Sequence, residues 1–205
     1  MDYAALATPD IVSKTVDALT KRNFKPIVVG TKEEALAKIK ELIPPGASVM
    51  NGSSRTLEEI GFVDYLKEGT HGWNNLHEAI VAEKDPGKQA ELRKHSVVSD
   101  YYLGSVHALP QTGELVIASN SGSQLPHLAY TSPNIILVVG TQKITESLSD
   151  ALDRIETYVI PLEDVNIMQK YGFHTMHAKT LILRQENPML GRNVHVILVN
   201  EKLGF

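Results

Sequence analysis

Residues 26–60 read PIVVGTKEEALAKIKELIPPGASVMNGSSRTLEEI, and this stretch alternates between a strand pattern and a helix pattern. Residues 26–30 form a short β-branched run that ends in glycine, which predicts a buried strand. A capping box at Thr31 then predicts the start of a helix, and two prolines end it. The same order repeats at once, with a strand expected at 47–50 and a further helix after the polar turn at 51–54.

The remainder of the chain continues this alternation. Apolar and β-branched runs predict strands at 101–106, 114–118, 135–139, 158–160, 180–183 and 194–199. Apolar residues at helical spacing predict helices at 8–19, 62–66, 85–98 and 148–155, with a loop at 69–75. The first helix is expected to begin with Thr8 as its capping hydroxyl and Pro9 in its first turn.

Alternating strands and helices predict a three-layer α/β/α fold with a mostly parallel sheet and helices on both faces. Shorter connections in the last third of the chain also favour some antiparallel pairing there. No linker, repeat or charge block divides the sequence, so we expect one domain over residues 1–205, with an N-terminal helical segment at 1–24. In sheets of this kind, ligands bind at the carboxyl ends of the strands.

The composition is that of a globular protein and excludes several classes of function. Hydrophobic residues make up 42% and charged residues 21% of the 205 residues, which excludes intrinsic disorder. The chain has no cysteine, so it cannot supply a thiolate nucleophile, a disulfide, an iron–sulfur cluster or a Cys-type zinc site. A net charge of −4 gives no general attraction to nucleic acid or anionic lipid. With no signal peptide pattern and no apolar run long enough to insert in a membrane, we expect a cytoplasmic protein.

The first candidate binding site is the polar turn that follows the second predicted strand. A strand ends and a helix begins here, so free backbone N–H groups and hydroxyls face the same place and could hold an anion. The alternative is an ordinary helix cap, which the local pattern alone favours. The candidate residues are Asn51, Gly52, Ser53, Ser54 and Thr56.

Two further loops also follow predicted strands directly. Gly122, Ser123 and Gln124 lie in the first, which contains small, hydroxyl and amide residues and could equally be a polar turn. Lys143 lies in the second and could reach a ligand anion, although a lysine in a loop is usually only solvated. If the preceding strands are parallel and adjacent, all three loops meet at one rim of the sheet. We therefore predict a shared anion-binding pocket.

Signals for metals, nucleotides and hydrolytic triads are missing. His174 and His177 stand three residues apart but lack an HExxH pattern or a clear third ligand, so chance pairing is the better account. His195 lies within a predicted strand and is interpreted as structural. The sequence contains neither the G-x-S-x-G elbow of a hydrolase nor a G-x-G-x-x-G dinucleotide motif after a strand. We expect the protein to carry no metal and no cofactor.

Several segments in this order and spacing resemble a LUD domain, a family named for lactate utilisation. The resemblance covers most of the chain from about Gly30 onward. The segments are NGSSRTLEEIG at 51–61, SDYYLGS at 99–105, QTGELV at 111–116, GSQ at 122–124, VVGTQKI at 138–144 and HVILV at 195–199.

This resemblance implies a fold similar to that of glucosamine-6-phosphate deaminase, ribose-5-phosphate isomerase and the CoA-transferases, in which the Ser/Thr-rich loop holds an anion. It also implies a role beside iron–sulfur oxidoreductase subunits that oxidise lactate, with the clusters held by those partners. A homodimer is a further expectation. Trp73, Tyr101 and Tyr102 are candidate interface anchors, with a core role as the alternative.

One position departs from the family pattern. Related CoA-transferases have a glutamate nucleophile where this chain has Gln111, and a carboxamide cannot perform that chemistry. Glu114 is interpreted as a solvated strand end rather than a substitute acid. Three hypotheses therefore remain: a protein of carboxylate metabolism that binds an anionic metabolite, a free-standing enzyme acting on a sugar phosphate or acyl-CoA, and a non-enzymatic regulatory module.

Overall fold

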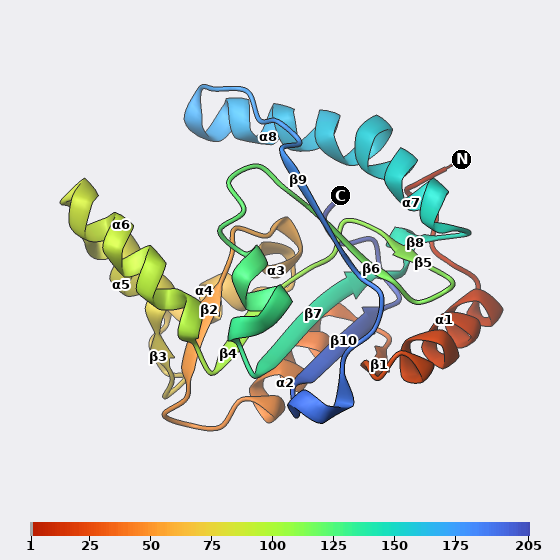
Figure 1. Cartoon of the computed structure of the whole chain (residues 1–205), viewed down its shortest axis with the longest axis horizontal. Helices are drawn as coiled ribbons and strands as arrows, with labels where there is room; N and C mark the ends of the chain where they lie inside the picture. The colour runs from red at the N-terminus through yellow and green to blue at the C-terminus, as the bar shows by residue number, and fades with distance from the viewer. Residues whose placement is uncertain (1) are drawn as a thin grey trace.

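The computed structural model describes residues 2–205 and is built around a six-stranded parallel sheet (Figure 1). Met1, which belongs to the predicted segment 1–24, lies outside the described residues. In spatial order the strands are β1 (Lys25–Val29), β10 (Asn193–Val199), β7 (Asn134–Gly140), β4 (Tyr101–Gly104), β2 (Ser48–Asn51) and β3 (Asn74–Asn75). All neighbouring pairs in this order are parallel.

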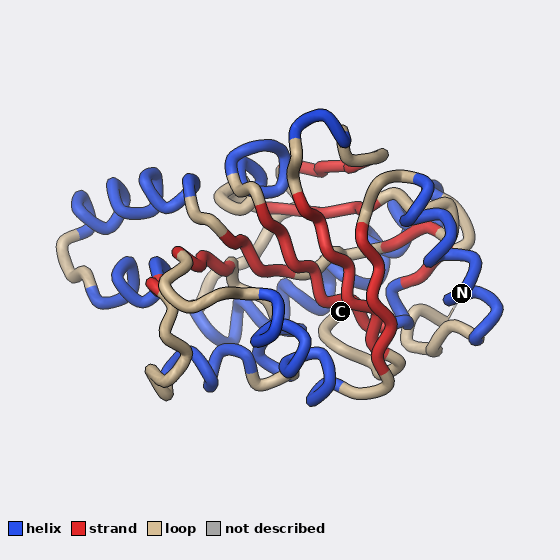
Figure 2. Tube along the Cα trace, turned by 90° about the horizontal axis from the view of Figure 1, so that it is seen from below, coloured by secondary structure: helices blue, strands red, loops and turns tan. Residues whose placement is uncertain are grey.

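Helices cover both faces of the sheet, and the predicted fold class is confirmed (Figure 2). On β7, Ile136 and Val138 pack towards one face, whereas Ile135, Leu137 and Val139 pack towards the other. This explains the unbroken apolar run in the sequence, because a strand buried on both sides needs apolar residues at every position. The helices are α1 (Pro9–Lys21), α2 (Lys32–Leu42), α3 (Arg55–Glu59), α4 (Phe62–Lys67), α5 (Leu76–Ala82), α6 (Pro86–His95), α7 (Leu148–Arg154) and α8 (Ile160–Tyr171).

The first face is covered by α2, α3 and α4, whose apolar residues form one core with the strands. The second is covered by α1 and by an antiparallel ribbon of β6 (Leu115–Ser119) and β9 (Lys179–Leu183). The ribbon's other side packs against α7 in a third, smaller core. Short pieces complete the chain: β5 (Leu109–Pro110), β8 (Ile144–Thr145), η1 (Ser96–Val98), η2 (His127–Thr131), η3 (Thr141–Lys143), η4 (Ile155–Val159) and η5 (Pro188–Leu190).

The strand predicted at 158–160 is wrong. These residues belong to a helical segment in which η4, a π-helical turn, joins α7 to α8 without a break. Ile155 and Val159 are both buried and stand four residues apart, so they share one helical face. The three-residue run Tyr158–Ile160, although rich in strand-favouring side chains, is too short to override a helical spacing that begins at Leu148.

Two local expectations also need correction. Glu114 is not a solvated strand end: only 6% of it is exposed, and its carboxylate pairs with Arg22 Nη2 at 2.6 Å. Thr8 precedes α1 as predicted, but its side chain makes no capping hydrogen bond. By contrast, the capping box of Thr31 and Glu34 is present at α2. Within residues 2–205, no helix combines the length and apolar character that crossing a membrane requires.

Candidate functional site

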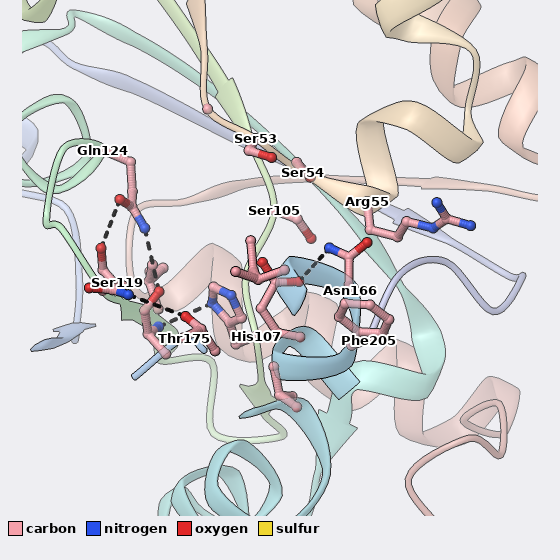
Figure 3. Close-up of a pocket in the computed structure, with 18 of the residues that line it drawn as sticks. Ser53, Ser54, Arg55, Ser105, His107, Ser119, Gln124, Asn166, Thr175 and Phe205 are labelled. Carbon is pink, nitrogen blue, oxygen red and sulfur yellow. Dashed lines mark hydrogen bonds between the residues drawn. The ribbon is translucent and has the colours of Figure 1, made fainter. Parts of the chain in front are cut away.

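A pocket of about 490 Å³ opens at the carboxyl ends of three neighbouring strands, β2, β4 and β7. The loops that follow these strands form its floor, the loop after β6 forms one wall, and α8 with the segment after it forms the roof (Figure 3). Seven of the nine predicted site residues line it, namely Gly52, Ser53, Ser54, Thr56, Ser123, Gln124 and Lys143.

The other two predicted residues lie beside the pocket rather than in its lining. Asn51 is the last residue of β2 and is buried, with its amide nitrogen directed at the carbonyl of Gly52. Gly122 has a φ of +84°, and its N–H donates to the Ser119 hydroxyl at 2.8 Å. Gly122 therefore shapes the loop that presents Ser123 and Gln124. Anion binding by the whole set stays a prediction.

The loops meet, but not entirely for the expected reason. β2 and β7 do belong to one parallel sheet, with β4 between them. β6 does not, because it pairs with β9 in the ribbon that lies over the sheet. Its loop still reaches the rim, where Ser119 donates to the Gln124 side-chain oxygen at 2.9 Å (Figure 3).

The turn at Gly52 depends on the absence of a side chain. A Cβ at this position would stand 2.7 Å from the Tyr102 hydroxyl, well inside van der Waals contact. The next residues continue into α3, where the Ser54 side chain accepts from the Leu57 N–H at 3.3 Å. Ser54 is thus a helix cap, as the simpler interpretation held. Since α3 has only five residues, its dipole is small, and the charge in the pocket must come from elsewhere.

Two lining cations, Arg55 and Lys170, are paired with Glu58 or Glu59. The third is Lys143, which is buried and not solvated. Its ammonium donates to the hydroxyls of Thr56 and Ser105, both at 3.0 Å, and to the carbonyl of Val106 at 3.2 Å. No carboxylate of residues 2–205 forms a salt bridge with it. Burial lowers the pKa of Lys143 to about 7, and the Arg154 guanidinium lowers it further, while the Glu59 carboxylate acts in the opposite direction.

Ser105 and His107 were missed by sequence reasoning, although both line the pocket. The predicted strand ran to residue 106, whereas β4 ends at Gly104, so Ser105 falls in the rim loop. His107 Nδ1 accepts the Ala118 N–H at 3.1 Å, which assigns the ring proton to Nε2. Burial, with the charge of Lys143 second, lowers the pKa of His107 to about 3, so its ring is neutral at physiological pH.

Arg154 lies next to His107, outside the pocket lining, and is fully buried. One of its nitrogens donates to the His107 carbonyl, and its guanidinium faces the rings of Tyr158 and Tyr3 at 5.2 and 5.8 Å. Burial lowers the pKa of Arg154 to about 10, which leaves it charged at neutral pH. Its helical position gave no sequence signal, because arginine in an amphipathic helix is usually exposed.

The roof comes from α8, which contributes Glu163, Asn166 and Lys170 to the lining. Lys170 pairs with Glu58 of α3 at 3.0 Å and so ties the roof to the floor. Asn166 donates to Glu163 at 2.9 Å, and burial raises the pKa of that glutamate. Beyond α8, the Thr175 N–H donates to Asp164 at 2.7 Å, which holds the lining residue Thr175 against the roof.

Apart from Tyr102, which lines the pocket, the remaining residues singled out from the sequence lie outside it. His174 pairs with Asp164 and His177 with Glu156, two separate pairs. In the described part of the chain, no cluster of three or more His, Asp or Glu side chains could hold a metal ion. Trp73 and Tyr102 are buried in the core and Tyr101 is half-buried, so the first two are not available as interface anchors in this structure. The other residues outside the lining are Gln111, Glu114 and His195.

Comparison with known proteins gives a family and a fold. A family model described as the LUD domain matches residues 12–199. The crystal structure of a DUF162 family protein from Deinococcus radiodurans is similar over 96% of this chain and 100% of its own, with 12% identity and a TM-score of 0.55. At this identity the likeness establishes the fold alone.

Two further structures are similar over part of their length. The eIF2B delta and beta proteins of Chaetomium thermophilum share 12% and 15% identity with the chain, each with a TM-score of 0.36. The matches cover 70% and 69% of this chain, and 55% and 48% of theirs. No curated protein matches the sequence.

Proposed function

Because the chain belongs to the LUD domain family, we propose that it serves lactate or related carboxylate utilisation by binding a small anionic metabolite in the pocket at the strand ends. The observation that carries this proposal is the buried Lys143 ammonium, which has hydroxyl and carbonyl partners but no salt bridge to a carboxylate within residues 2–205. A positive charge away from water interacts strongly with an anion, because the surroundings screen it weakly.

The other lining groups suit a small, polar anion. Ser53, Ser119 and Gln124 offer hydroxyl and amide groups that can orient carboxylate oxygens. The pocket is also within the size range of small-molecule sites. An anion next to Lys143 would raise the pKa of the ammonium, so that binding takes up protons near neutral pH.

The test is a thermal-shift screen with lactate, pyruvate, sugar phosphates and CoA esters, followed by calorimetry on each ligand that raises the melting temperature. Ser53→Asp places a negative charge in the lining and should weaken binding by at least about tenfold. Ser149→Asp on the exposed side of α7 is the matched control and should bind like the wild type. Equal affinity of wild type and Ser53→Asp would show that the ligand binds elsewhere.

The proposal extends to a redox partner. Oxidation of lactate needs an electron acceptor, and this chain has no cysteine with which to hold an iron–sulfur cluster. We propose that a separate iron–sulfur oxidoreductase subunit supplies it. Co-purification of the tagged protein from its native cells should recover a Cys-rich redox protein, and its absence would favour an independent enzyme or a regulatory module.

A further inference from the structure

We propose that Ser105 and Lys143 form a nucleophile–base pair that cleaves small carboxylic esters by acyl transfer. This inference deepens the proposed function, on which it rests for the occupancy of the pocket, because the acid released from such an ester is itself a small carboxylate. It assigns Ser105 the role of nucleophile, Lys143 the role of general base and Thr56 the role of a positioning residue.

The arrangement has the three parts that activation of a serine requires. Ser105 Oγ lies 3.0 Å from Lys143 Nζ, which is hydrogen-bond distance for proton transfer. Thr56 Oγ1 and the Val106 carbonyl hold the same nitrogen from other directions, at 3.0 and 3.2 Å. The base is thus oriented by two fixed groups, as the imidazole is oriented by aspartate in a Ser-His-Asp triad.

The proton can move between two defined states. When Lys143 is charged, it donates to Ser105, whose own proton lies towards the Val138 carbonyl at 2.7 Å. When Lys143 is neutral, its lone pair can accept the Ser105 proton instead. Because the pKa of Lys143 is near 7, both states are populated at neutral pH, whereas a solvated lysine would be almost entirely charged.

A substrate can reach the pair from the pocket. Ser105 is only half-buried and lines the pocket, with Ser53 and Ser54 in the same lining (Figure 3). His107 also lines it and carries its proton on Nε2, since Nδ1 is occupied by the Ala118 N–H. A neutral Nε2–H is a donor that can stabilise the oxyanion of a tetrahedral intermediate.

The reaction balances with water as the only co-substrate. Ser105 Oγ attacks the ester carbonyl carbon while its proton passes to Lys143 Nζ. The tetrahedral intermediate then expels the alcohol, which takes that proton as the carbon–oxygen bond to the leaving group breaks. Water attacks the acyl-enzyme and gives a proton to Lys143, the Ser105–acyl bond breaks, and Lys143 returns the proton to Ser105. The products are a carboxylic acid, which ionises, and an alcohol.

The experiment uses p-nitrophenyl acetate as the probe, with release of p-nitrophenolate and intact and peptide mass spectrometry as readouts. The wild type should gain one acetyl group on Ser105, which hydroxylamine removes. Ser105→Ala should lose this label, and Ser149→Ala on the exposed side of α7 should keep it. Lys143→Met should lower the acylation rate by at least about 100-fold.

A second variant separates the loss of the base from the loss of the positive charge. Lys143→Arg keeps a positive charge but cannot act as a base, so it should also lose acylation if it folds. Acylation of Ser105→Ala at the wild-type rate, or a hydroxylamine-resistant acetyl group on Lys143, would overturn the proposal. Anion binding without acylation would remove the nucleophile–base pair and leave the proposed function standing. Acylation without anion binding would support the nucleophile–base pair and contradict the proposed function.

Discussion

Lys143 holds a positive charge inside the protein with hydroxyls and a carbonyl as its hydrogen-bond partners. Such a position costs stability, since a buried cation loses its hydration and gains no full counter-charge. Thr56 and Ser105 each have a second partner, at Leu203 O and Val138 O, so they would stay hydrogen-bonded without the lysine. We therefore expect that the loss of stability caused by burying Lys143 is retained because the pocket needs this side chain for its function.

We predict that Lys143→Met is more stable than the wild type at pH 6, by about 1–3 kcal/mol. The folded-state pKa of about 7 lies below the ordinary 10.5, so the folded protein binds fewer protons than the unfolded chain between these values. The free energy of unfolding of the wild type therefore rises as the pH increases from about 7 to 10.5, because Lys143 loses its proton in the folded state first. The stability advantage of Lys143→Met should shrink over the same pH range. Urea unfolding at pH 6 and pH 9 measures both effects, and a Lys143→Met protein that is less stable at pH 6 would contradict them.

A second prediction at this scale concerns Gly52. Gly52→Ala should cost about 1–3 kcal/mol, because its Cβ would stand 2.7 Å from the Tyr102 hydroxyl. Tyr102→Phe removes that hydroxyl, and the next ring atom is 3.9 Å away, so the double variant should recover most of the loss. A double-mutant cycle by thermal unfolding tests this coupling, and simple additivity would refute it.

At the scale of elements, patterns in the sequence predict the sheet well where burial is uniform. β7 and β10 are apolar at nearly every position and are found at or within one residue of the predicted limits. The partner of β6 could not be predicted, because a fully buried strand looks the same in a parallel sheet and in an antiparallel ribbon. Ser105 was missed for a related reason, since strand ends are set by tertiary contacts that local pattern does not contain.

The roof helix α8 is expected to be the most easily opened element near the site. None of its twelve residues is fully buried: Ile160 packs against the core beneath α7, and polar contacts such as the Lys170–Glu58 pair hold the rest. Asp164→Ala removes the carboxylate that accepts from the Thr175 N–H and pairs with His174. We predict faster trypsin cleavage at Lys170 and Lys179 in this variant with unchanged global stability. Asp153→Ala on the exposed side of α7 is the control. Equal trypsin cleavage rates in Asp164→Ala and Asp153→Ala would show that Asp164 does not hold the segment after α8 in place.

At the scale of the whole molecule, the dimer remains a prediction. Buried Trp73 and Tyr102 are not available for its interface, so we expect exposed apolar side chains to form it, and Val165 and Met168 on α8 are among those exposed. Light scattering should give about twice the chain mass of 22.6 kDa at micromolar concentration. A mass of 22.6 kDa under those conditions would contradict self-association.

The pairing of β1 with β10 has a consequence for the synthesis of the protein. Lys25 lies opposite His195 in the sheet, so β1 cannot pair with β10 until a strand far along the chain has been made. Until residues 193–199 have left the ribosome, β1 has no partner strand and β7 can pair only with β4, so their edges towards β10 stay unpaired on the nascent chain. Contacts so distant in sequence fold slowly, because a long loop must close before they form. The nascent chain is therefore expected to depend on chaperones until β10 has been made and has paired with β1 and β7.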